Sequence, residues 1–143
     1  MASKTFTTMV GLENYIESVC ALAVKNAAKI ICDKLKECIN EQYYNDPYFY
    51  PNVYQRTETF LQSATYDLLS NNSAMIYVDG DGMHYQNGFD SWQVVEWASQ
   101  SQHGADYYQT NTIDFWTTFM EWCDGNVVNI LRQELKKAGI NVS

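Results

Sequence analysis

An uninterrupted amphipathic run, residues 9–42, constrains the fold more than any other feature of this 143-residue chain. Its apolar side chains recur at spacings of three and four, the period of an α-helix. No proline interrupts it, and Pro47 sets the latest point at which a helix can end. The sequence therefore predicts one helix, roughly 50 Å long. The stripe predicted to face the core is Leu12, Ile16, Val19, Cys20, Ala23, Ala27, Ile30, Ile31, Leu35, Cys38 and Ile39.

A helix of this length is long for so small a domain, so we expect part of it to pack on a neighbouring chain. On its solvent side, Lys29 and Asp33 are four residues apart and can form an ion pair. Cys20 and Cys38 fall within the apolar stripe, where structural thiols belong. Cys32 lies off the stripe, and we expect its thiol to be exposed.

Residues 43–63 are expected to form a tyrosine-rich loop followed by an Arg-Thr turn. The loop proper, 43–54, holds both prolines of the protein and six aromatic residues, so it should be extended but stiff. Tyrosine is favoured at protein interfaces because it has an apolar body and a polar tip. Two roles stay open: these rings contact another chain, or they cover the long helix of their own chain. For Arg56, the alternatives are a structural tie and a contact between subunits.

The region 64–85 predicts a β-hairpin. Its two strands, 64–70 and 73–79, are joined by Asn71-Asn72, because asparagine tolerates the left-handed conformation of tight hairpins. In the second strand, apolar residues alternate with Met75, Tyr77 and Asp79, which gives the strand two distinct faces. Residues 83–85 are a candidate for a further short strand. A helical turn beginning at Phe60 is the alternative for the start of this region.

Two more helices complete the prediction. A short one is expected over 92–98 and a long C-terminal one over 111–138, with Asn111 as its N-cap. Gly139 suits a left-handed C-cap, after which Ile140 folds back onto Leu135. The whole chain, 1–143, is therefore expected to be a single α+β domain. In it, the long N-terminal helix and the C-terminal helix pack on a small antiparallel β-sheet.

The net charge of −8 argues against an electrostatic grip on nucleic acid or on an anionic membrane, although DNA sliding past is compatible with it. No apolar run approaches the roughly 18 residues of a membrane span. The N-terminus also lacks an apolar signal core. With four cysteines at scattered positions, we expect a soluble protein with reduced thiols in a cytoplasmic setting.

No motif predicts a catalytic, cofactor or metal site. The segment Asp79-Gly80-Asp81-Gly82 differs from a calcium loop, because Met83 and His84 stand where an oxygen ligand and a glycine are needed. The cysteines, with His84 and His103, have no zinc-like spacing, and glycine-rich phosphate loops are absent. A nucleophilic Cys/His pair that is adjacent only in space has no local signature and stays open.

The order of these motifs resembles that of a phage family. A long helix precedes a Tyr-x-Arg-Thr-x-x-Phe-Leu-x-Ser segment, then a hairpin ending in Tyr-Val-Asp, then a helix ending in Glu-Leu-Lys-Lys-Ala-Gly. The chain is similar to the tail-completion or head–tail joining proteins, also called minor capsid proteins, of long-tailed bacteriophages and prophages. It departs from them where Glu58 replaces a glycine and where Asp-Gly-Asp-Gly replaces a Glu-x-Gly-Thr. The matching residues are Tyr54, Arg56, Thr57, Leu61, Ser63, Ile76, Tyr77 and Asp79 and, more loosely, Phe115, Trp116 and 134–136.

The resemblance implies a structural protein of the virion neck, made in the bacterial cytoplasm, with no enzymatic activity and no cofactor. Copies would form a ring between the portal or adaptor complex and the tail tube or tail terminator. DNA would pass through the lumen without specific binding, and no membrane would be involved. Tail completion, tail termination and a head-side adaptor role stay open. The expected contact residues are Tyr48, Tyr50, Tyr54, Arg56 and Thr57.

Two other classes are the alternatives to a neck protein. The first is a small phage-encoded accessory enzyme or regulatory binding module, which would show a cleft with perturbed acids or a basic patch. The second is a peptide-binding module that uses the free edge of the sheet.

Overall fold

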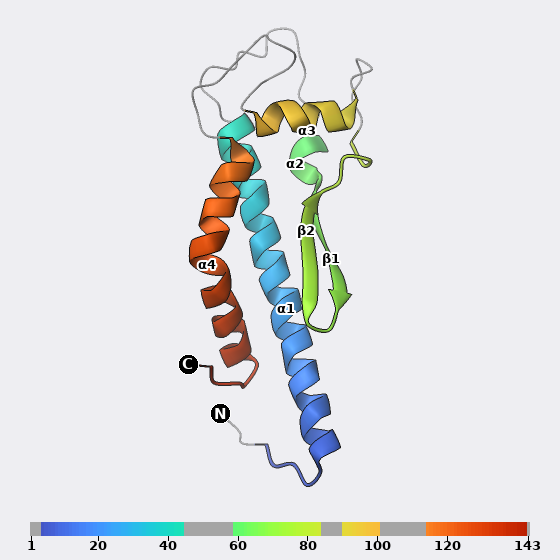
Figure 1. Cartoon of the computed structure of the whole chain (residues 1–143), viewed down its shortest axis with the longest axis vertical. Helices are drawn as coiled ribbons and strands as arrows, with labels where there is room; N and C mark the ends of the chain where they lie inside the picture. Colours follow the sequence, from blue (N-terminus) through green and yellow to red (C-terminus); the bar gives the residue numbers. More distant parts are fainter. Residues whose placement is uncertain (1–3, 45–58, 84–89, 101–113, 143) are drawn as a thin grey trace.

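The computed structural model describes residues 4–44, 59–83, 90–100 and 114–142, and Figure 1 shows their arrangement. The long N-terminal helix, the C-terminal helix and a two-stranded antiparallel sheet confirm the predicted α+β class. The elements in chain order are α1 (Met9–Ile39), a π-helical turn η1 (Asn40–Tyr44), α2 (Thr59–Gln62), β1 (Ala64–Ser70), β2 (Ser73–Val78), α3 (Ser91–Ser99) and α4 (Phe115–Lys137).

Helix α1 is the central element, because α4 and the hairpin pack on different sides of it (Figure 1). The helix starts after Thr8, whose hydroxyl oxygen accepts a hydrogen bond from the backbone N–H of Gly11 at 3.1 Å. From there it continues without a break for 31 residues. Its first turns extend beyond the tip of the hairpin, whereas its C-terminal half lies between the two packing partners (Figure 1).

The buried side chains of α1 span a wider sector of the helix than the predicted stripe, because both α4 and the hairpin pack on it. Asn26 and Lys34 contact α4, through Glu134 and the ring of Trp122 respectively. A second row of buried side chains, at the other edge of this sector, points about 170° away from the midpoint between Asn26 and Lys34 at 100° per residue, so it faces the hairpin. This second row is Ala28, Cys32, Leu35 and Ile39.

The expectation that Cys32 is exposed is therefore wrong, since only 3% of this residue is accessible. The physical reason is that the hairpin covers the side of α1 that a single-stripe pattern assigns to solvent. Ile16 and Ile30, both predicted to be in the core, are instead 42% and 39% exposed. Ile30 points about 100° away from Ile31, on the side of α1 that is turned from the hairpin.

The hairpin matches its prediction closely. Ala64 pairs with Val78 and Tyr66 with Ile76, and these four side chains belong to the core or pack against it. The register shifts between Leu68 and Ser70, next to the Asn71-Asn72 turn. Strand β2 ends at Val78, and Met83 lies outside any strand, so the predicted further strand does not begin there. Residues 84 and 85 lie outside the described residues.

The helical turn that was the alternative for the start of the hairpin region also exists, as the four-residue helix α2 immediately before β1. Within it Phe60 is fully buried, and its ring meets that of Phe115 edge to face at a centroid distance of 5.4 Å. This contact ties the segment before the hairpin to the first turn of α4.

Both later helices are present, with different boundaries at α4. Helix α3 spans Ser91–Ser99, close to the predicted 92–98, and Asp90 caps it. Helix α4 begins at Phe115 because Asp114 is its N-cap, so the assignment of Asn111 as the cap is wrong. One carboxylate oxygen of Asp114 accepts from the Thr117 N–H at 2.7 Å, and the other accepts from the Thr117 hydroxyl at 2.8 Å. Asn111 itself lies outside the described residues.

Helix α4 ends in the predicted left-handed C-cap. Gly139 has a φ of 106°, in the left-handed region that favours glycine. The N–H of Ile140 donates to the carbonyl of Leu135 at 2.9 Å, and that of Gly139 donates to Lys136 at 3.1 Å. This pair of bonds is the Schellman arrangement, which satisfies carbonyls that the helix end leaves unpaired.

Alanine at Gly125, within α4, and at Gly139, just after it, should have opposite effects on stability. Gly139→Ala should destabilise the protein by about 1–2 kcal/mol, because a Cβ is disfavoured at positive φ. The new Cβ would also lie 3.1 Å from the Tyr15 hydroxyl. Gly125→Ala should stabilise it by roughly 0.5–1 kcal/mol, since the residue is helical and the added Cβ would have no described neighbour within 4 Å other than the backbone of its own helix and the adjacent residues. Urea unfolding followed by circular dichroism measures both.

Removing the Phe60 ring should cost about 3–5 kcal/mol, because Phe60→Ala leaves a cavity between α2 and α4. The matched control is Leu69→Ala, at an exposed site in β1, which should change stability by less than about 0.5 kcal/mol. Equal losses for the two variants in urea unfolding would contradict the assigned core.

Candidate assembly surfaces

The five residues predicted to make contacts, Tyr48, Tyr50, Tyr54, Arg56 and Thr57, fall within 45–58 and so lie outside the described residues. Their roles stay predictions. The elements that flank the segment are described, and both lie at the same end of the molecule (Figure 1). On one side η1 continues α1 through Tyr44 and contacts α4, so Tyr43 and Tyr44 are helical where the predicted loop began. On the other side α2 packs on α1.

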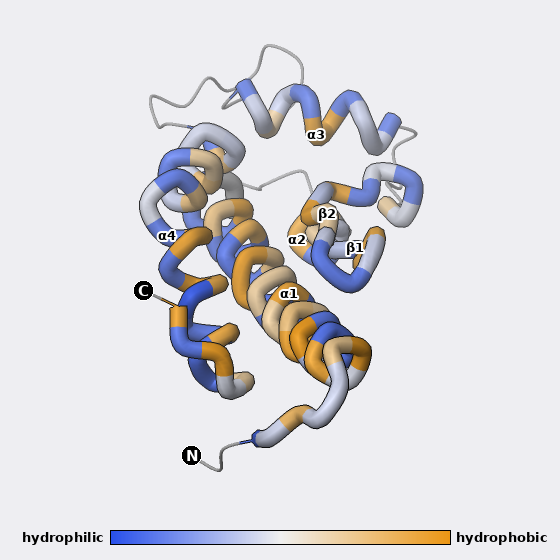
Figure 2. Tube along the Cα trace, turned by 60° about the horizontal axis from the view of Figure 1, so that its bottom comes forward, coloured by the Kyte–Doolittle hydropathy of each residue, from blue (hydrophilic) through white to orange (hydrophobic). Residues whose placement is uncertain are grey.

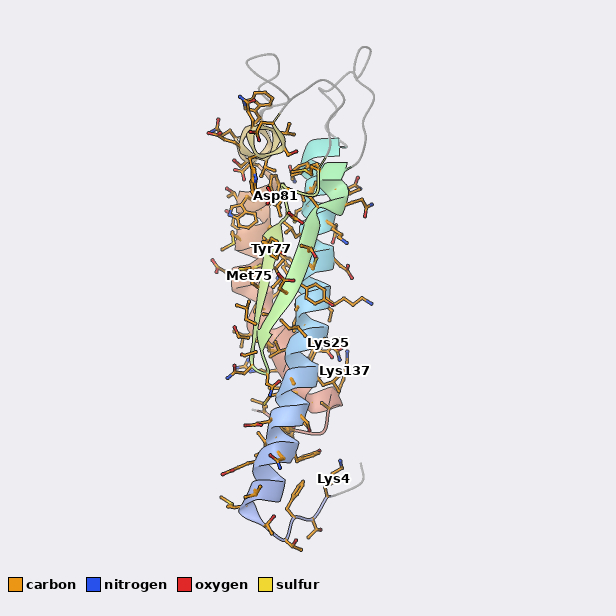
Figure 3. All side chains as sticks on the ribbon, turned by 90° about the vertical axis from the view of Figure 1, so that its right-hand side faces the viewer. Lys4, Lys25, Met75, Tyr77, Asp81 and Lys137 are labelled. Atoms are coloured by element: carbon orange, nitrogen blue, oxygen red, sulfur yellow. The ribbon has the colours of Figure 1, made fainter. Side chains whose placement is uncertain are left out.

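The outer face of the hairpin is one candidate surface. It consists of Thr65, Asp67, Met75 and Tyr77, which alternate with the residues that pack on α1. Met75 and Asp67 are exposed. The Tyr77 hydroxyl donates a hydrogen bond to an Asp67 carboxylate oxygen at 2.8 Å. Figure 3 looks onto this face and labels Met75 and Tyr77 on it, with Asp81 in the turn at its end.

The charges of this face act on Tyr77. Its hydrogen bond to Asp67 raises the pKa of the Tyr77 hydroxyl, because ionisation would break that bond beside a carboxylate. Partial desolvation and the negative charges of Asp67 and Asp79 raise this pKa further. The face is therefore acidic, and the tyrosine stays protonated on it at neutral pH.

The acidic turn after β2 is held in place by α3. Within the turn, an Asp79 carboxylate oxygen accepts from the Asp81 N–H at 3.1 Å. The indole Nε1 of Trp92 donates to Asp81 at 3.1 Å, and the indole ring lies on Gly80. A Cβ at position 80 would sit 2.5 Å from a ring atom, so glycine is needed for this close approach. The Trp92 contact was not predicted, because nothing in the sequence links the turn to a residue on α3.

These carboxylates act as hydrogen-bond acceptors in the described fold. Among the described residues, no group of three or more histidine, cysteine, aspartate or glutamate side chains is placed to hold a metal ion. His84 and His103 lie outside those residues.

A ridge of lysines on α1 is a second candidate surface. We define the lysine ridge as Lys25, Lys29 and Lys36 together with exposed Leu22, all within about 60° on the helix at 100° per residue. The predicted ion pair between Lys29 and Asp33 does not form. Across the described residues, the ion pairs are Lys34 with Glu37 at 3.1 Å and Lys137 with Glu134 at 2.9 Å. The three ridge lysines thus keep their charges unpaired within the described chain.

The first turns of α1 are a third candidate surface. Met9, Val10 and Ile16 are exposed there, and Figure 2 shows hydrophobic residues at this end of the helix. Part of the same end is covered by the N-terminal segment, since the Phe6 ring contacts Tyr15 at a centroid distance of 4.9 Å. An exposed apolar helix end is typical of a contact site for another chain.

The cysteines have the properties of structural thiols. Cys32 and Cys38 are buried, and Cys20 and Cys123 are half-buried. Burial raises the pKa of Cys32, Cys38 and Cys123, so these three thiols stay protonated at neutral pH. A protonated, buried thiol is a poor nucleophile and a poor metal ligand.

One protein family accounts for nearly the whole chain. The model of the YomN family matches residues 8–137, from the N-cap of α1 to the last turn of α4, so the chain belongs to this phage-associated family. No curated protein and no solved structure matches the sequence significantly. Within the described residues, no helix is both long and apolar enough to cross a membrane.

Asp67→Asn should lower the pKa of Tyr77, because it removes the carboxylate that makes the largest contribution to the raised value. Tyrosine ionisation is followed by ultraviolet absorbance in the wild type and in Asp67→Asn. For each of them, the titration curve of the same protein with Tyr77→Phe added is subtracted, so that the difference reports Tyr77 alone. Asp90→Asn is the matched control, as it removes one charge at the cap of α3 and should leave the Tyr77 titration unchanged. Identical Tyr77 curves with and without Asp67 would contradict the assigned bond.

Proposed function

We propose that this YomN-family chain is a structural virion protein of the phage neck, where it joins the DNA-filled head to the tail as part of an oligomeric ring. The observation that carries the proposal is the construction of α1. Its C-terminal half packs against both α4 and the hairpin, whereas its first turns extend past both and expose Met9, Val10 and Ile16. A long helix with apolar side chains that extend beyond the elements packed on it is suited to contacts with other chains.

The described surfaces also support a structural role. The turn at the end of the outer hairpin face is bound to α3, because the Trp92 indole donates to Asp81 and lies on Gly80. A turn that is already held in place loses less conformational freedom on binding, which favours assembly. The raised pKa values of Cys32, Cys38 and Cys123 do not favour thiol nucleophiles. We propose in addition that the chain has no enzymatic activity.

In this function the partners are further copies of the chain, the adaptor or portal complex on the head side, and the tail-tube or tail-terminator proteins on the tail side. DNA passes through the lumen of the ring. The net charge of −8 supports such a channel, because an acidic wall does not retain the phosphate backbone. The protein is made in the host cytoplasm and ends up in the virion neck.

Deletion of the gene from its phage or prophage tests the proposal directly. We expect DNA-filled heads and complete tails to accumulate separately, and a plasmid copy of the gene to restore joined particles. Electron microscopy of the lysate counts heads, tails and joined particles. Joined, infectious particles without the gene would contradict the neck role, and a block in replication or lysis would indicate a regulatory or enzymatic protein instead.

A further inference from the structure

We propose that the outer hairpin face of one copy docks on the lysine ridge of α1 in the next copy, so that repeated contacts of this kind close the ring. The inference rests on the proposed function for its biological setting, while its geometry comes from the described residues alone. The occupant of both surfaces is therefore a second copy of this chain.

The lysine ridge is a cationic surface on a strongly acidic protein. Lys25 and Lys29 are exposed, Lys36 is half-buried, and none of them forms an ion pair with a described residue. Asp33 lies beside the ridge, which leaves a net charge of +2 for these four side chains. Leu22, exposed at the N-terminal end of the ridge, adds an apolar contact. Much of the remaining described surface of α1 is covered by α4 or by the hairpin, apart from the first turns and a sector that exposes Ile30.

The outer hairpin face has the opposite charge. Asp67 lies on it, Asp79 and Asp81 follow at its end, and no lysine or arginine occurs from Ala64 to Met83. The carboxylates of Asp67 and Asp81 accept hydrogen bonds from Tyr77 and Trp92 respectively, which orient them without neutralising their charge. Exposed Met75, beside Tyr77, is the apolar counterpart of Leu22.

The two surfaces also agree in length. Lys25 and Lys36 are eleven residues apart on a helix, which is about 16 Å. Asp67 pairs with Met75, and Asp79 lies four residues farther along the same direction, which is about 13 Å in an extended chain. Opposite charges arranged over similar lengths set the register of a contact and steer the two partners together.

The position of the two surfaces favours a ring over a two-fold dimer of hairpins. In Figure 3 the hairpin faces the viewer, while Lys25 lies on the part of α1 that extends to its side. A copy thus has one acidic and one basic surface that do not overlap, and hairpin and helix run along the same long axis (Figure 1). Head-to-tail contacts of this kind are heterologous and form a ring when the rotation from copy to copy closes, whereas hairpin against hairpin would oppose like charges.

Charge swaps test the contact. The ridge variant carries Lys25→Glu, Lys29→Glu and Lys36→Glu, and the hairpin variant carries Asp67→Lys and Asp81→Lys. Each should fail to restore joined particles in the deletion phage, with at least about a tenfold drop, because like charges then face each other. A chain with all five substitutions should restore joining, and so should the two variants expressed together, since each then finds a complementary partner.

The control variant carries Glu121→Lys and Asp124→Lys, two exposed positions on α4 with the same charge change as the hairpin variant. It should join heads and tails like the wild type. Circular dichroism must show that every variant is folded. For the purified wild-type chain, zero-length carbodiimide cross-linking and mass spectrometry should find links from the ridge lysines to Asp67 or Asp81 between copies, and high salt should reduce them.

The outcomes separate this inference from the proposed function. If the deletion phage makes no joined particles but the ridge and hairpin variants both restore them, the chain is a neck protein whose ring uses other surfaces, and the inference is wrong. The inference is also wrong if neither the chain with all five substitutions nor the co-expressed ridge and hairpin variants restore more joined particles than either variant alone. If the deletion phage makes normal particles but the purified chain shows the expected cross-links, the neck role is wrong and the contact between copies still holds.

Discussion

The burial of α1 on two sides is the interaction on which the rest of the structure depends. Helix α4 and the hairpin make few contacts with each other, and both are held mainly through α1. The side chains at this double contact are small or thiol-bearing, including Ala27, Ala28, Cys32 and Cys38, so both partners can approach the helix closely. Because protein interiors are densely packed, larger side chains here would push one partner away.

Packing on two sides also decides which surfaces remain available. The inner face of the hairpin packs on α1, so its acidic outer face stays exposed. The lysine ridge lies on a sector of α1 that neither α4 nor the hairpin covers. The first turns of the helix extend past both partners with an apolar surface. Three surfaces of different character thus lie along one elongated molecule. Such an arrangement suits a subunit that contacts its neighbours in an assembly.

The local structure was predictable wherever a residue's role depends on its own backbone. The Asn71-Asn72 turn and the left-handed Gly139 are examples, because their conformations follow from side-chain sterics and need no distant partner. The N-cap of α4 was predictable in type only. Asn111 and Asp114 are both good caps, and the choice of Asp114 places Phe115 at the start of the helix, where its ring meets Phe60. That contact joins residues far apart in the sequence.

The sequence by itself determined the long helix, the hairpin and its two-faced alternation, and the C-terminal end of α4, because periodicity and capping act within a few residues. It also determined the acidic charge that argues against a grip on nucleic acid. Only the tertiary structure decided that Cys32 is buried, that Trp92 closes over Gly80, and that Lys29 leaves Asp33 unpaired. The burial of Cys32 depends on which element packs on which side of α1, and the Trp92 contact depends on where α3 lies relative to the turn after β2. A helical period indicates how wide an apolar face is, but not how many partners share it.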